Sequence, residues 1–216
     1  MTPQAGLFLS ALAFVGTHFL LSHPLRAPLV RALGQGAFQG VYSLVALITF
    51  GLAIYFYRAI GREPPLWPVG DGLWLAGSVL MWLGAILFVG SFVRNPALPG
   101  ARVTGPPTGV FGITRHPMMW GFALWAAVHL MVVATPKALV LDGAILFLAL
   151  AGAAGQDAKK SKLVGAKWHE WVAQTAFIPF TRGVANPGAL ALIGGTLLFF
   201  AATWLHPAPA GFWRWL

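Results

Sequence analysis

The stretch GLWLAGSVLMWLGAILFVGSFV, from Gly72 to Val93, carries no charged side chain over its whole length. A helix needs about 20 apolar residues to cross the hydrocarbon core of a bilayer, so this stretch predicts a membrane-spanning helix. Five further stretches have a similar character, and together they predict an all-α integral membrane protein, a bundle of about six transmembrane helices. The six expected segments are Ala5–Ser22, Ala37–Tyr57, Gly72–Val93, Pro117–Ala134, Ala138–Gly155 and Ala189–Leu205.

The composition agrees with a membrane location. Hydrophobic residues make up 58% of the 216-residue chain and charged residues only 9%, whereas soluble domains carry about 25% charged residues. The connecting segments are too short for a second domain, so we expect residues 1–216 to form one. The chain has no cysteine, which excludes disulfides, iron–sulfur clusters and thiolate ligation of haem.

The net charge of +9 lies in short loops between apolar segments, so we read it as membrane orientation and exclude nucleic acid as a partner. With the N-terminus outside, four of the 14 Lys and Arg residues fall in outer segments, and ten in inner loops. The outer four are Arg58, Arg62, Lys137 and Arg214. The inner ten are Arg26, Arg31, Arg94, Arg102, Arg115, Lys159, Lys160, Lys162, Lys167 and Arg182. The positive-inside rule therefore predicts that both termini are outside.

The segment Gln156–Val172 has a mixed character. Its apolar residues, which include Trp168 and Trp171, recur at helical spacing, and its lysines fall on the other side. This pattern is typical of an interfacial amphipathic helix, with tryptophans at headgroup depth and lysines facing anionic lipid. The alternative is a lid over a site that opens at the membrane surface.

Ionisable residues within the apolar segments are costly and tend to mark function. His18 lies near the inner end of the first segment, His129 well inside the fourth, and Asp142 inside the fifth. His129 suits either a hydrogen bond between helices or a metal or haem ligand. The turn at Thr135 and Pro136 places His129 and Asp142 at one depth. The carboxylate could then orient a ligating imidazole, or the two could form a buried pair without a ligand.

The run ITRHPMMWG (Ile113–Gly121) is the most distinctive local motif. Pro117 suits the first turn of a helix, whose free N–H groups would lie beside Arg115 and His116. This arrangement suits a phosphate or carboxylate, although it is equally a basic helix start that obeys the positive-inside rule. No zinc-binding motif, phosphate-binding glycine loop or GxSxG sequence occurs.

Four blocks resemble the NnrU family of bacterial membrane proteins, and the resemblance extends from about Phe8 to Phe180. The blocks are GTHFLLSHPLRAPLVRALG (Gly16–Gly34), GVYSLVALITFGLAIYFY (Gly40–Tyr57), GVFGITRHPMMWGFALWAAVHL (Gly109–Leu130) and QDAKKSKLVGAKWHEWVAQTAFIPF (Gln156–Phe180). The resemblance implies a multi-pass protein of the bacterial inner membrane, linked to denitrification and with nitric oxide reductase as an expected partner.

The family is similar to 15-cis-zeta-carotene isomerase, a membrane enzyme that uses haem b. This similarity implies haem b as cofactor, a lipophilic small molecule as substrate, and His18 and His129 as axial ligands of the haem iron. The spacing from His116 to His129 fits that of the isomerase.

Two other classes of function stay open. RHP followed by a C-terminal tryptophan-rich block and IPF resembles, more distantly, membrane methyltransferases that use S-adenosylmethionine. In that case Arg115, His116 and Asp157 would hold the cofactor, although the acidic element here is reduced to Gln156 and Asp157. The third class is a non-enzymatic assembly factor for a respiratory complex.

Overall fold

The structure is a computed structural model that describes residues 1–96 and 105–216, and the described residues form helices without strands. Arg102, one of the ten basic residues assigned to inner loops, lies outside the described residues. Two short helices, α2 (Arg26–Leu33) and α7 (Ala166–Gln174), and two 3-10 turns, η1 (Gly109–Gly112) and η2 (Gly211–Trp215), join or follow the long ones. The long helices are α1 (Pro3–Ser22), α3 (Gln35–Ala59), α4 (Asp71–Gly90), α5 (Pro117–Val133), α6 (Pro136–Val164) and α8 (Ala189–Trp204).

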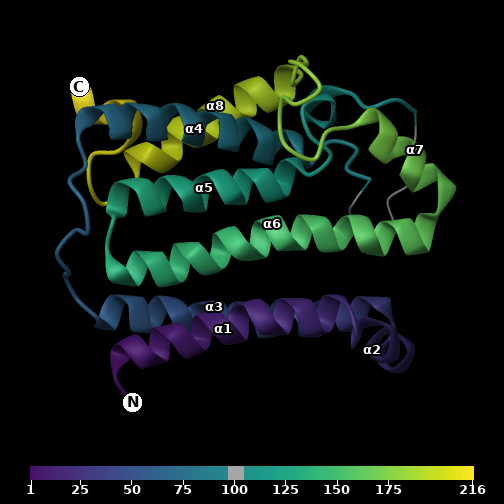
Figure 1. Ribbon diagram of the computed structural model, residues 1–216, viewed down its shortest axis with the longest axis horizontal. Helices are drawn as coiled ribbons and strands as arrows, with labels where there is room; N and C mark the ends of the chain where they lie inside the picture. The colour runs from purple at the N-terminus through teal and green to yellow at the C-terminus, as the bar shows by residue number, and fades with distance from the viewer. Residues whose placement is uncertain (97–104) are drawn as a thin grey trace.

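Successive long helices run in opposite directions, and they form two groups on either side of α6 (Figure 1). On one side α1 packs against α3 and α6, and on the other α5 packs against α6 and α4, which in turn packs against α8. Both chain termini lie at one end of the bundle, which we call the terminal end. The opposite end carries α2 and α7, and we call it the α7 end (Figure 1).

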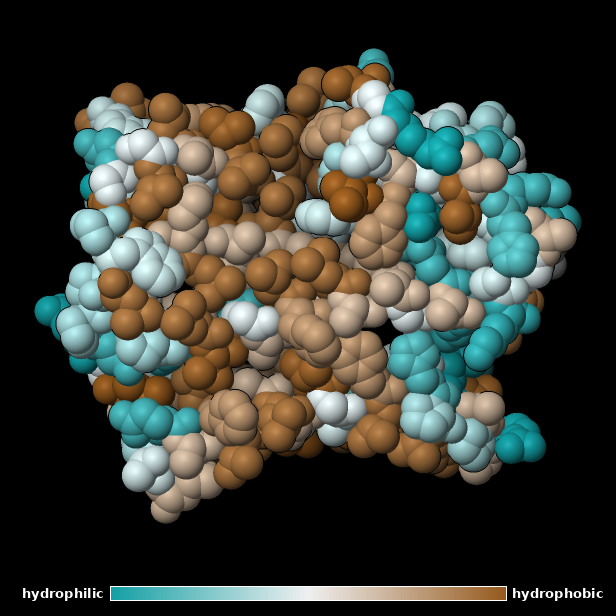
Figure 2. Space-filling view, in the orientation of Figure 1, coloured by the Kyte–Doolittle hydropathy of each residue, from teal (hydrophilic) through white to brown (hydrophobic). Residues whose placement is uncertain are grey.

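The surface has an apolar belt between two polar ends (Figure 2). Large apolar side chains such as Leu44, Leu47 and Leu197 are more than half exposed in this belt, and water would disfavour such a surface. Helices α1, α3, α4 and α6 are long and apolar enough to cross a membrane, while α5 and α8 are apolar but shorter. The belt and these helices confirm the prediction of an all-helical, multi-pass membrane protein.

The helix boundaries follow from the caps in the sequence. Thr135 accepts a hydrogen bond from the backbone N–H of Ala138, and Pro136 occupies the first turn of α6. Ala134 ends α5 in the left-handed conformation, at φ 49°. The predicted tight turn between the fourth and fifth segments is therefore confirmed.

Small residues bring α4 close to both neighbouring helices. A Cβ atom added to Gly84 would lie 3.3 Å from Leu124 of α5. On α8, a Cβ atom at Gly195 would lie 2.5 Å from the Cα atom of Ile86. Such close approach lets α4, α5 and α8 form one closely packed layer.

The predicted interfacial helix over 156–172 is wrong in two respects. First, α6 continues to Val164 and α7 starts after Gly165, whose φ of 67° breaks the helix. Second, Trp168 and Trp171 are only 1% and 5% exposed, because they pack against Phe111 and its neighbours near η1. The two indoles bury more apolar surface in this protein core than they would at the headgroup level of a bilayer. A lid over a site at the membrane surface stays an alternative prediction for this segment.

Candidate functional site

A groove of about 1150 Å³ lies between the α1/α3 pair and the layer of α4, α5 and α8. Helix α3 packs mainly on α1 and barely touches α6, so the groove stays open between the two groups of helices. Its α6 wall is small and apolar, with Ile145, Leu148, Ala149 and Gly152. Its aromatic lining residues are Phe14, Phe19, Phe38, Tyr42, Phe50, Phe88, Phe122, Trp125 and Phe199. The size and the apolar lining suit a lipophilic ligand.

His18 lines this groove from α1. Its Nδ1 lies 2.7 Å from the carbonyl oxygen of Phe14, and its ring contacts the rings of Phe14 and Tyr42. Because a carbonyl only accepts hydrogen bonds, Nδ1 carries the proton and Nε2 keeps its lone pair. Within the described residues Nε2 makes no hydrogen bond, so it is available to a ligand.

His129 repeats the same local arrangement on α5. Its Nδ1 donates to the carbonyl oxygen of Trp125 at 2.8 Å, and the centroid of its ring lies 4.0 Å from that of Trp125, with the rings tilted by 33°. However, His129 does not line the groove, and its ring lies 6.4 Å from that of His206, beyond the end of α8.

The two histidines lie at different depths. At 1.5 Å rise per residue, His18 is about 6 Å from the last residue of α1, and His129 about 18 Å from the first residue of α5. Both of these helix ends lie at the α7 end of the bundle (Figure 1). The structure therefore does not bring the two imidazoles face to face.

Asp142 is buried on α6, with 3% exposure. It lies within electrostatic range of Tyr57 on α3, whereas the ring of His129 lies near that of His206, which follows α8. His129 donates the hydrogen bond of its Nδ1–H to the Trp125 carbonyl and not to the Asp142 carboxylate. The predicted pair of His129 and Asp142 is therefore not formed, because residues at one depth point to opposite sides of the hairpin.

The ITRHP motif forms a closed ion cluster, which we call the RHP cluster: Arg115, His116 and Asp157. Arg115 binds Asp157 Oδ2 through both Nε and Nη2 at 2.8 Å, and His116 Nε2 lies 2.9 Å from Oδ1. The His116 side chain has no exposed surface. The sequence predicted an anionic group at Arg115, and the chain supplies that group itself from α6.

Residues 175–180 cover the RHP cluster. Arg115 donates its backbone N–H to the carbonyl of Ala176 at 2.8 Å, and Thr114 and Trp120 donate to the carbonyl of Phe177. The Phe177 ring lies 5.2 Å from the Arg115 guanidinium carbon. The cluster thus fastens the C-terminal block to the start of α5. The similarity to methyltransferases, which pairs RHP with an acidic residue, was the one signal for this contact.

A set of basic side chains lines the groove at the α7 end, and we call it the cationic mouth: Arg26, Lys159 and Lys160. Sequence reasoning assigned these residues to membrane orientation and to a lipid-facing helix. It missed their common position because Arg26 starts α2 while both lysines lie late in α6.

These features define the class of the protein: a polytopic helical membrane protein with an apolar groove between two groups of helices. The chain belongs to the NnrU family, whose model matches residues 6–213.

It is also similar to the chloroplastic 15-cis-zeta-carotene isomerase of Arabidopsis thaliana, with 25% identity over 188 residues. That match covers 83% of this chain and 50% of the relative, so the chain spans about half the length of the curated protein. No solved structure matches the chain. The predicted family resemblance is confirmed.

Proposed function

We propose that this protein holds a lipophilic molecule in the groove and acts on it as an isomerase-like membrane enzyme. The observation that carries the proposal is the apolar groove of about 1150 Å³, into which His18 brings an imidazole with a free Nε2. The similarity to a carotene isomerase supports a long apolar substrate. The groove residues would bind and orient that substrate and keep water away from it.

The proposal includes six spans with both termini outside, in a bacterial inner membrane. Six long antiparallel helices with both termini at one end support an even number of crossings (Figure 1). Helices α5 and α8, with 17 and 16 residues, measure about 25 Å at 1.5 Å per residue. Modest thinning of the bilayer accommodates such lengths.

Haem b is the proposed prosthetic group, and His18 is its proposed ligand. An imidazole with its proton fixed on Nδ1 and its Nε2 free has the form that iron binds, and aromatic rings from several helices surround it. When bound, haem supplies an iron centre with a coordination position open to a substrate or to nitric oxide. His18 would hold the iron, and Phe14 and Tyr42 would fix the orientation of the His18 ring.

Absorption spectra of protein purified after haem-replete expression test this assignment. Wild-type protein should show a Soret band that shifts on reduction, and His18→Ala should lose the band. His129→Ala is the matched control, since it removes the same side chain with the same local bonding outside the groove. Loss of the band in both variants would assign the iron two histidine ligands, and no band in the wild type would refute the haem proposal.

The methyltransferase alternative has less support. Arg115 and His116 are engaged by Asp157, and the cavity beside them has a volume of about 20 Å³. A small-molecule site usually needs about 300 Å³ or more. Saturable binding of S-adenosylmethionine would restore this alternative.

The link to denitrification, and an assembly role with nitric oxide reductase as partner, stay predictions of the family resemblance. Copurification with that reductase, without any bound cofactor, would favour the assembly role over the enzyme.

A further inference from the structure

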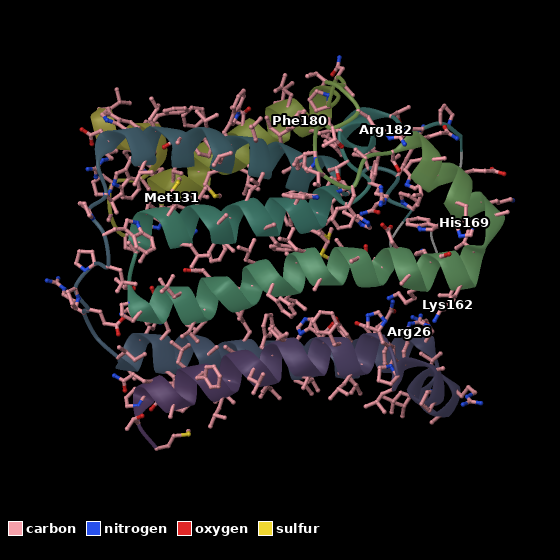
Figure 3. The ribbon with its side chains drawn as sticks, in the orientation of Figure 1. Arg26, Met131, Lys162, His169, Phe180 and Arg182 are labelled. Atoms are coloured by element: carbon pink, nitrogen blue, oxygen red, sulfur yellow. The ribbon has the colours of Figure 1, made fainter. Side chains whose placement is uncertain are left out.

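Basic side chains from two helices converge at the α7 end of the groove. Arg26 extends from the start of α2, and Lys159 and Lys160 extend from α6; all three line the groove. Figure 3 shows Arg26 beside the late part of α6, where Lys162 is also labelled. Arg26 donates to the side-chain oxygen of Gln35 at 3.3 Å, and Lys160 donates to the carbonyl of Pro96 at 2.9 Å. The Gln35 acceptor is neutral, so it does not cancel the positive charge of Arg26.

Three of the acidic residues lie away from this end, and the two at the α7 end, Asp157 and Glu170, form no ion pair with Arg26 or Lys159 within the described residues. The sequence has five: Glu63, Asp71, Asp142, Asp157 and Glu170. The first three lie near the terminal end, and Asp157 is bound by Arg115 and His116. Within the described part of the chain, Arg26 and Lys159 form no ion pair. The cationic mouth is therefore a concentration of positive charge at the end of an apolar groove.

The groove is accessible from the bilayer. Several of its lining residues are also exposed on the apolar belt, among them Leu47 at 69%, Leu198 at 40% and Phe122 at 43%. Leu163, next to the cationic mouth, is 65% exposed. A membrane lipid could thus enter sideways, with its tail in the groove and its head at the polar end of the molecule.

We propose that the groove binds an anionic phospholipid-like amphiphile, with its phosphate at the cationic mouth and its apolar body along the aromatic lining. Arg26 and Lys159 neutralise the headgroup, and the groove holds the chain portion as far as His18. This proposal rests on the proposed function, because both concern the same groove, and it names the class of molecule that binds there. It does not depend on haem.

The test is lipid competition measured by native mass spectrometry. Purified protein is exchanged into detergent with equal amounts of phosphatidylglycerol and phosphatidylcholine, and the bound lipids are counted. Wild-type protein should retain phosphatidylglycerol preferentially. The preference should fall roughly 25-fold in the double variant Arg26→Gln/Lys159→Gln, because each of the two cations contributes about fivefold in affinity for an anionic lipid.

The matched control is Lys167→Gln/Arg182→Gln, which removes the same charge from exposed positions outside the groove. Arg182 lies across the same end of the molecule from Arg26 (Figure 3). The control should keep the wild-type preference, as should the charge-conserving variant Arg26→Lys/Lys159→Arg. An equal loss in the Lys167/Arg182 variant would overturn the proposal in favour of diffuse surface charge, and an undiminished preference in Arg26→Gln/Lys159→Gln would refute it.

The proposal can fail separately from the haem assignment. His18→Ala should abolish the Soret band and leave the lipid preference unchanged. If Arg26→Gln/Lys159→Gln lowers the haem content but not the lipid preference, the cations serve the carboxylates of haem, and the lipid proposal is wrong.

Discussion

His18 and His129 make the same local contacts but have different surroundings. Each donates Nδ1–H to the carbonyl four residues earlier, and each contacts the aromatic ring of that earlier residue. Residue type and spacing make the two equivalent as ligand candidates. Only the packing of the helices separates them, because it puts His18 on the groove and His129 beside His206.

At the RHP cluster, we predict that Asp157→Asn destabilises the protein by about 2–3 kcal/mol, since it leaves Arg115 and the buried His116 without their anion. Thermal unfolding followed by tryptophan fluorescence should show a clear fall in Tm. Glu170→Gln, which neutralises an exposed carboxylate on α7, is the control and should leave Tm unchanged. An unchanged Tm in Asp157→Asn would contradict the fastening role of the cluster.

The pKa of His23 measures the electrostatic effect of the positive charges at the cationic mouth. Partial burial, followed by the charges of Lys159 and Lys162, lowers the pKa of His23 below its ordinary value. Lys159→Gln removes one positive charge and should raise this pKa, because the imidazolium is then repelled less. A pH titration of the His23 ring by NMR measures the change. The exposed-site variant Lys167→Gln should change it less, and equal shifts would argue against a local cluster.

Among the elements, α4 depends on close contact with α8. We predict that Gly195→Ala destabilises the protein by about 1–3 kcal/mol, because its Cβ would meet the backbone of Ala85 and Ile86. Gly143→Ala on α6 is the control, since no atom lies within 4 Å of its added Cβ. Chemical unfolding in detergent compares the two. If Gly195→Ala and Gly143→Ala had the same free energy of unfolding, α4 and α8 could move apart with little loss of stability, and the prediction would be wrong.

Most helices could be predicted from the sequence, but the packing of α7 could not. Uninterrupted apolar runs and the Thr135–Pro136 cap locate the ends of the long helices to within three residues, except that α6 continues to Val164, nine residues beyond the predicted end at Gly155. The spacing of Trp168 and Trp171 showed that they share one helix face. It could not show that the face packs on Phe111 and its neighbours, because that partner comes from a distant segment.

For the whole molecule, the sequence indicated individual site residues but not the groove. A hydropathy pattern treats a groove-lining Phe50 and a lipid-facing Leu44 alike, since both are apolar. The cationic mouth could not be predicted for a similar reason, because the positive-inside rule explains each of its basic residues separately. Their convergence depends on the packing that brings the start of α2 and the late turns of α6 to the same end of the groove.

Membrane orientation gives a further prediction at this scale. The chain has no cysteine, so single cysteines report topology without background. In intact cells an impermeant maleimide should label Thr2→Cys at the terminal end and should not label Lys167→Cys on α7. Permeabilised cells provide the control, in which both should react. The reverse pattern in intact cells would put the termini inside.

The central claim is that the groove is the ligand-binding site, and filling it tests this most directly. Gly152 lines the groove, and a Cβ atom added to it meets no atom within 4 Å, so Gly152→Trp would place an indole inside the groove. Gly143→Trp adds the same side chain to the same helix outside the groove. Mass spectrometry of small molecules extracted from the purified proteins should find the bound ligand in wild type and Gly143→Trp, and none in Gly152→Trp. Undiminished ligand in folded Gly152→Trp would contradict the claim.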